Sequence, residues 1–136
     1  MSSYNTNLAA EYYVLSVLYR LGLNAYLTVG NKKAVDIIIG EKSGELVTID
    51  VKGLAGKTGW PVDNVKRAKQ RHFIVFVCFR GEIDRPESVP EAFIIPSREL
   101  RKYIYKAPGG RRVVSLATLM KKGLKYRFNW KSLSKI

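Results

Sequence analysis

The stretch Val35-Asp36-Ile37-Ile38-Ile39-Gly40, followed after a short polar segment by Leu46-Val47-Thr48-Ile49-Asp50-Val51-Lys52-Gly53, decides the fold predicted for this chain. Both segments are rich in β-branched residues and are bounded by turn residues, which is the pattern of β-strands. Gly44 lies between them and can adopt the left-handed backbone conformation that a tight turn requires. The sequence therefore predicts a β-hairpin.

Three charged side chains gather on one face of this hairpin. If its loop is residues 42–44, a type I turn closed by Gly44, the register places Asp36 opposite Asp50. Side chains alternate across a strand, so Asp50 and Lys52 share a face and Asp36 joins them. Two carboxylates about 5 Å apart repel by roughly 3 kcal/mol at an effective dielectric of about 20. The alternative is that Asp36 is a solvated strand end and that Asp-x-Lys is a chance sequence.

A cation between the two carboxylates would turn this repulsion into binding. Mg²⁺ is typically held by one or two carboxylates together with carbonyl and water oxygens, so the pair predicts a magnesium site. Lys52 would then stabilise a developing negative charge or orient the attacking water.

A further carboxylate, Glu11, lies in a predicted helix over residues 8–21, which Asn5, Thr6 and Asn7 precede as candidate caps. Glu11 falls in the middle of the apolar arc of this helix. A carboxylate buried without a partner costs several kcal/mol, so Glu11 is expected to be paired, bound to metal through water, or protonated. The alternative is a carboxylate that is simply favourable near the helix N-terminus.

The other elements follow from apolar patterns and turn residues, and they predict one domain over residues 1–136 with an α/β (α+β) fold. Its mixed central β-sheet would be flanked by helices. We expect a strand at 24–29, a helix at 65–71 capped by Asp63 or Asn64, a strand buried on both faces at 73–79, a strand at 92–95, a helix at 98–105 capped by Ser97, a strand at 113–116 and a short helix or turn at 117–122. The alternating basic and aromatic residues at 124–130 predict a half-buried strand, or an aromatic and basic surface for nucleic acid, and the two are compatible.

The charge predicts a polyanionic partner. The chain has 24 Lys and Arg against 11 Asp and Glu, a net charge of +13, and no acidic residue follows Glu99. Nucleic acid fits such a surface, with an anionic membrane surface or mere solubility as alternatives. The candidate phosphate-binding residues are Lys57, Thr58, Lys66, Arg67, Lys69, Arg71, Arg111 and Arg112.

Several other classes are disfavoured. The first residues carry no signal-peptide pattern and the longest apolar run, 73–79, is too short to cross a bilayer, so a soluble cytoplasmic protein is expected. Cys78 is the sole cysteine, so an intramolecular disulfide or a cysteine zinc cluster is impossible. The sole histidine, His72, is interpreted as a surface residue. Gly56-Lys57-Thr58 imitates a nucleotide-binding loop but lacks its first glycine and its helix. Trp60 is either a core residue or a platform for a base.

The order of these elements and charges resembles the PD-(D/E)xK nuclease superfamily over residues 7–80, with an αβββαβ core like that of restriction endonucleases, Holliday-junction resolvases and tRNA endonucleases. The matching residues are Glu11, Asp36 and Asp50-Val51-Lys52, with Val35 where the name-giving proline stands. The resemblance implies that Asp36, Asp50 and the backbone carbonyl of Val51 bind Mg²⁺, for which Mn²⁺ can substitute. It also implies that Lys52 assists the attacking water and that Glu11 completes the site, through water if it reaches the metal.

Together these features predict a metal-dependent nuclease. DNA is favoured over RNA as the substrate, and a homodimer is expected because so small a chain must reach two strands. The alternative is a non-catalytic basic nucleic-acid-binding module on the same fold.

Overall fold

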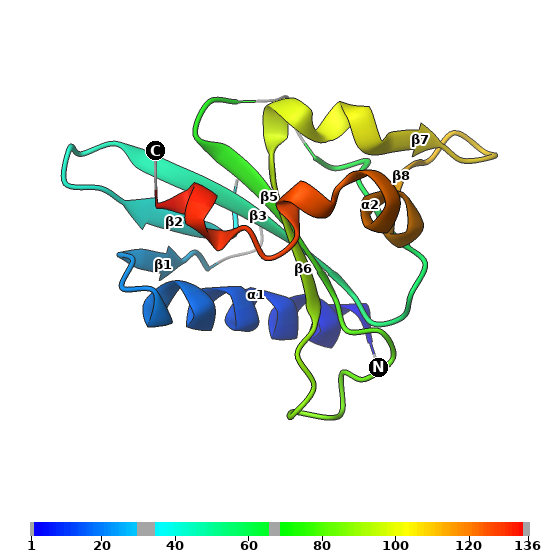
Figure 1. The fold of residues 1–136 in the computed structure, drawn as a ribbon, viewed down its shortest axis with the longest axis horizontal. Helices are drawn as coiled ribbons and strands as arrows, with labels where there is room; N and C mark the ends of the chain where they lie inside the picture. The colour runs from blue at the N-terminus through cyan, green and yellow to red at the C-terminus, as the bar shows by residue number, and fades with distance from the viewer. Residues whose placement is uncertain (1, 30–34, 66–68, 135–136) are drawn as a thin grey trace.

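The computed structural model describes residues 2–29, 35–65 and 69–134, which form a mixed five-stranded sheet with helices and a smaller sheet around it (Figure 1). In the large sheet the strand order is β1-β2-β3-β5-β6. These strands are β1 (Ala25–Leu27), β2 (Ile37–Gly40), β3 (Leu46–Leu54), β5 (His72–Cys78) and β6 (Glu91–Pro96). β3 and β5 are parallel and the other neighbours are antiparallel, so the predicted fold class is confirmed.

A smaller three-stranded sheet has the order β4-β8-β7. Its strands are β4 (Gly59–Pro61), β7 (Ile104–Lys106) and β8 (Arg112–Ser115), and all of them pair antiparallel. The helical elements are α1 (Ser3–Arg20), α2 (Leu116–Lys122) and the 3-10 helices η1 (Ser97–Tyr103), η2 (Leu124–Tyr126) and η3 (Trp130–Leu133). No helix among the described residues is both long enough and apolar enough to cross a membrane.

Helix α1 covers one face of the large sheet. Its buried residues Ala10, Val14 and Leu18 pack with Val47 and Ile49 of β3 and with the same-facing residues of β5. A second cluster fills the opposite face, where Ile74 and Phe76 of β5 meet Trp60, Phe93 and Leu119. β5 is buried along its whole length, which explains its uninterrupted apolar sequence.

The predicted hairpin is confirmed in its register. Ile37 pairs with Ile49, and the turn is closed by a hydrogen bond of 2.9 Å from the Gly44 N–H to the Glu41 carbonyl. Gly44 has φ +86°, the left-handed conformation that the prediction assigned to it.

The first helix begins earlier than predicted. It is capped by Ser2, whose Oγ accepts the Asn5 N–H at 3.2 Å, so the prediction that residues 5–7 cap it is wrong. Its end at Gly22 is confirmed, since α1 stops at Arg20 and Gly22 takes φ +77°.

The helix predicted over 65–71 is not seen in its described part, because Val65 and residues 69–71 are not helical, while 66–68 lie outside the described residues. Ser97 does not cap the next helix. Its hydroxyl instead exchanges hydrogen bonds with the backbone N–H and carbonyl of Lys69. That helix is a 3-10 helix ending at Tyr103, where β7 begins.

The strand predicted over 124–130 is also wrong, because this segment forms η2 and the start of η3. Arg127 forms a bidentate ion pair with Glu91, which is buried on β6, at 2.7 and 2.8 Å. Phe128 takes φ +53°, which interrupts an extended chain, and its N–H donates to the Ala92 carbonyl at 2.8 Å. A pairing with a distant carboxylate therefore overrides the alternating pattern.

Gly53 allows α1 to approach β3 closely, and this predicts a defect on substitution. A Cβ at Gly53 would lie 2.9 Å from the Thr6 carbonyl oxygen and 3.0 Å from the Ala10 Cβ. We expect Gly53→Ala to lower the free energy of unfolding by about 1–3 kcal/mol, measured by denaturant titration. Gly56→Ala is the control, because nothing lies within 4 Å of the added Cβ there. Equal midpoints for the two variants would contradict close packing at Gly53.

Candidate active site

The register of β2 with β3 brings Asp36 to Asp50. Asp36 comes just before Ile37, the partner of Ile49, which aligns it with Asp50 as predicted. Its N–H donates to the Ile49 carbonyl at 2.9 Å, and its Oδ2 accepts the Val51 N–H at 2.7 Å. The Asp36 carboxylate is therefore fixed against the backbone of β3 between Asp50 and Lys52.

His72 contacts the second carboxylate. It is 5% exposed, and its Nε2 lies 3.1 Å from Oδ2 of Asp50. An ionised carboxylate only accepts hydrogen bonds, so Nε2 is the donor. The interpretation of His72 as a surface residue is wrong, because the parallel pairing of β3 and β5 places His72 beside Thr48 and buries it.

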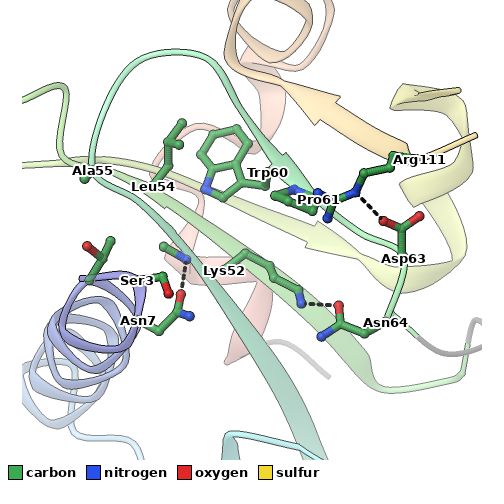
Figure 2. A pocket seen from close by; sticks show the side chains of 12 residues that line it. Ser3, Asn7, Lys52, Leu54, Ala55, Trp60, Pro61, Asp63, Asn64 and Arg111 are labelled. Carbon is green, nitrogen blue, oxygen red and sulfur yellow. Dashed lines mark hydrogen bonds and ion pairs between the residues drawn. The ribbon is translucent and has the colours of Figure 1, made fainter. Parts of the chain in front are cut away.

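Lys52 lies on the same face of β3 as Asp50 and contacts a loop residue. Its Nζ donates to Oδ1 of Asn64 at 2.6 Å (Figure 2). Partial burial lowers the pKa of Lys52 below its ordinary value, and the charges of Asp50 and Asp36 act in the opposite direction. The ammonium thus lies within electrostatic range of both carboxylates.

A cleft of about 620 Å³ opens at Lys52. Figure 2 shows Ser3 and Asn7 of α1 on one side, and Pro61, Asp63, Asn64 and Arg111 on the other. Trp60 also lines it, but this side chain is 1% exposed and donates its Nε1–H to the Val77 carbonyl at 3.2 Å. Trp60 is therefore a core residue, and of the two interpretations the base platform is the wrong one.

Glu11 is 7% exposed on α1, within the apolar side of the helix as predicted. That side packs on the face of β3 formed by Val47 and Ile49, whereas alternation directs Asp50 and Lys52 to the opposite face. The contribution of Glu11 to a metal site stays a prediction.

The side chains near Lys52 offer carboxylate oxygens to a metal ion. Within residues 2–29, 35–65 and 69–134, no group of three or more Asp, Glu, His or Cys side chains could hold a metal ion. Mg²⁺ usually keeps several waters and needs only one or two carboxylates. Asp36 is bound to the backbone of Ile49 and Val51, the two residues on either side of Asp50, so the two carboxylates lie in one neighbourhood. This donor set fits a hard cation that takes oxygen ligands.

The candidate phosphate-binding residues fall in two regions. Around the small sheet are the exposed Lys57 and Thr58, in the loop between β3 and β4, and the exposed Arg111 and Arg112, of which Arg111 lines the cleft at Lys52. At the start of β5, Lys69 and Arg71 line a hollow of about 270 Å³ together with His72 and Arg98. Lys66 and Arg67 lie outside the described residues.

Arg71 is already engaged within the fold. Its Nη2 lies 2.8 Å from Oε2 of Glu41, and its Nε lies 3.6 Å from Oε2 of Glu45. These contacts tie the turn between β2 and β3 to the start of β5, so a role in phosphate binding stays a prediction.

Two residues near the cleft were predicted only as helix caps. Asn64 holds the Lys52 ammonium, and Asp63 accepts the Arg112 N–H at 2.8 Å and pairs with Arg111 Nε at 3.2 Å. The Arg112 backbone N–H, followed by Arg111, lowers the pKa of the Asp63 carboxyl. The sequence holds no local signal for these contacts, since Asp63 and Arg112 are far apart in the chain and meet through β4 and β8.

The comparisons with known proteins bear on the fold. No protein-family model matches this chain, and no curated protein does. Among solved structures, the fold is similar to that of the bacterial homing endonuclease I-Ssp6803I, with a TM-score of 0.63 over 99% of this chain and 95% of that chain. The sequence identity is 17%, so the similarity concerns the fold, which is a fold found in a nuclease.

Proposed function

We propose that this chain is a metal-dependent DNA endonuclease of the PD-(D/E)xK type. The observation that carries the proposal is the position of Asp36, just before β2, whose carboxylate accepts the Val51 N–H between Asp50 and Lys52 of β3. The similarity of fold to a homing endonuclease and the net charge of +13 support it.

Each residue has a role in this proposal. Asp36, Asp50 and the carbonyl of Val51 would hold Mg²⁺ or Mn²⁺. The metal would polarise the phosphate and lower the pKa of a bound water. Lys52 stabilises the negative charge that develops on the phosphate during cleavage, and Asn64 positions its ammonium.

His72 is proposed as a positioning residue for Asp50. Its Nε2 lies 3.1 Å from Oδ2 of that carboxylate, which restricts the rotation of the carboxylate and leaves the other oxygen available to a metal ion. Hydrogen-bond partners of metal-ligating side chains commonly tune affinity in this way.

We also propose that two copies act together on duplex DNA. One domain of this size offers a single Asp-Asp-Lys arrangement among its described residues, whereas a double-strand cut requires one such arrangement for each strand. Mass measurement of the protein bound to a short duplex would test this.

Removing the lysine should separate cleavage from binding. We expect Lys52→Ala to lower the cleavage rate of plasmid DNA in Mg²⁺ by about 100-fold or more while duplex affinity in EDTA changes little. The control Lys42→Ala removes the same charge from the exposed turn between β2 and β3 and should cleave normally. Cleavage by Lys52→Ala at the normal rate would refute the proposed role, and binding of DNA without cleavage by the unaltered protein would favour the non-catalytic module.

The carboxylate pair should bind a divalent ion. We expect Mg²⁺ or Mn²⁺ to raise the thermal midpoint of the unaltered protein, because a ligand that binds the folded state stabilises it. In Asp50→Asn this increase should be lost, since the variant keeps the shape of the side chain and removes its charge. A midpoint increase of equal size in both proteins would place the ion elsewhere.

The proposed role of His72 can be separated from a packing role. We expect His72→Phe to weaken Mn²⁺ binding by about tenfold or more, measured by calorimetry, because Asp50 loses its donor. His72→Gln, whose amide N–H can reach the position of Nε2, should restore most of the affinity. If both variants bind Mn²⁺ like the unaltered protein, His72 has no positioning role.

A further inference from the structure

The hairpin of β7 and β8, residues 104–115, pairs with β4 along residues 113–115, and its turn end extends beyond the rest of the chain at one end of the molecule (Figure 1). It is closed by hydrogen bonds from the Ala107 N–H to the Arg111 carbonyl at 2.7 Å and from the Gly110 N–H to the Ala107 carbonyl at 2.9 Å. Gly109 and Gly110 have φ values of +91° and +89°, so only small residues suit this tip. The tip is therefore slim as well as tightly closed.

Two positively charged side chains face each other across this hairpin, and their repulsion destabilises it when no ligand is bound. Lys106 and Arg112 stand directly opposite each other, and both are exposed. Like charges on opposite positions of a strand pair destabilise it. Among the described residues, neither side chain forms an ion pair within 4.0 Å: Asp63 pairs with the side chain of Arg111 and accepts the backbone N–H of Arg112, whose charge attracts it from a longer distance. A polyanion would relieve the repulsion.

The hairpin is joined to the cleft at Lys52 through one residue. Arg111 lines the cleft of about 620 Å³ and also a hollow of about 250 Å³ on the outer face of the small sheet, where Tyr105 and Val113 lie. Its ion pair with Asp63 holds it at the boundary of the two cavities (Figure 2). A nucleic acid that contacts the hairpin would thus continue toward Lys52.

The shape of the hairpin selects among nucleic acids. The major groove of B-form DNA is about 12 Å wide and admits a two-stranded β-ribbon. The major groove of an RNA duplex is deep and too narrow for side chains to read, and single strands have no groove. Residues 106–112 form the two-stranded end of the small sheet, beyond the last pair of β4 with β8 (Pro61 with Val113), and this end with a cation on each strand matches the DNA groove.

We infer that the hairpin of β7 and β8 enters the major groove of duplex DNA and that Lys106 and Arg112 contact the DNA there. The inference rests on the proposed function only in taking Lys52 as the place where the DNA is cut. DNA binding by the hairpin itself requires neither a metal nor cleavage.

The test measures duplex binding in EDTA, so that the result is independent of catalysis. We expect Lys106→Ala/Arg112→Ala to bind a random-sequence DNA duplex about tenfold or more weakly than the matched double variant Arg20→Ala/Lys42→Ala. Both double variants lose two exposed charges, but Arg20 ends α1 and Lys42 lies in the turn between β2 and β3, and these two segments are at the opposite end of the molecule from the β7–β8 hairpin (Figure 1). Thermal unfolding of the hairpin variant should be unchanged or shifted upward, since the variant removes a like-charge pair.

Groove occupancy is tested with the unaltered protein. Duplexes that carry bulky groups on the C5 of pyrimidines have a filled major groove, and they should bind more weakly by about the same factor as the hairpin variant loses. A small molecule that fills the minor groove should leave the affinity unchanged. The unaltered protein should bind an RNA duplex of the same sequence with the weak affinity that the hairpin variant has for the DNA duplex. Equal affinities for the two double variants, or loss of binding on filling the minor groove instead, would overturn the inference while leaving the proposed nuclease activity untouched.

Discussion

Hydrogen bonding along both edges of β3 is the constraint on which the site depends. One edge pairs antiparallel with β2 and aligns Asp36 with Asp50, and the other pairs parallel with β5 and places His72 beside Asp50. Because side chains alternate with a period of two, a shift of either pairing by one residue would turn these groups to the face that α1 covers. The packing of Ile37 and Ile49 under α1 therefore fixes the charges as well as the core.

The two apolar clusters of the sheet have different consequences for the site. The cluster beneath α1 holds β2 and β3 in register, whereas the cluster on the other face, with Trp60 and Phe76, supports the loop that carries Asp63 and Asn64. The ring centroids of Trp60 and Phe76 lie 5.0 Å apart in an edge-to-face arrangement. Positioning of the Lys52 ammonium by Asn64 thus depends on packing several residues away.

The sequence predicted those parts of the structure in which local pattern and neighbouring pairing decide. The hairpin, its register, the buried Glu11 and the strand at β5 follow from β-branched runs, a turn glycine and helical periodicity. Contacts between distant segments could not be predicted in this way. The burial of His72 requires the parallel pairing, and the ion pair of Arg127 with Glu91 replaces an expected strand by 3-10 turns.

The ion pair between Asp63 and Arg111, together with the hydrogen bond from Arg112, has a consequence for the geometry of cleavage. It fastens the turn end of the β7–β8 hairpin to the segment that also carries Asn64, next to Lys52. On the proposed roles, the element that holds the DNA and the residue that acts on the phosphate are parts of one rigid unit. In such a unit the distance between the hairpin and Lys52 is constant. The DNA would therefore be cut at a constant number of base pairs from the position of the hairpin, independent of the base sequence there.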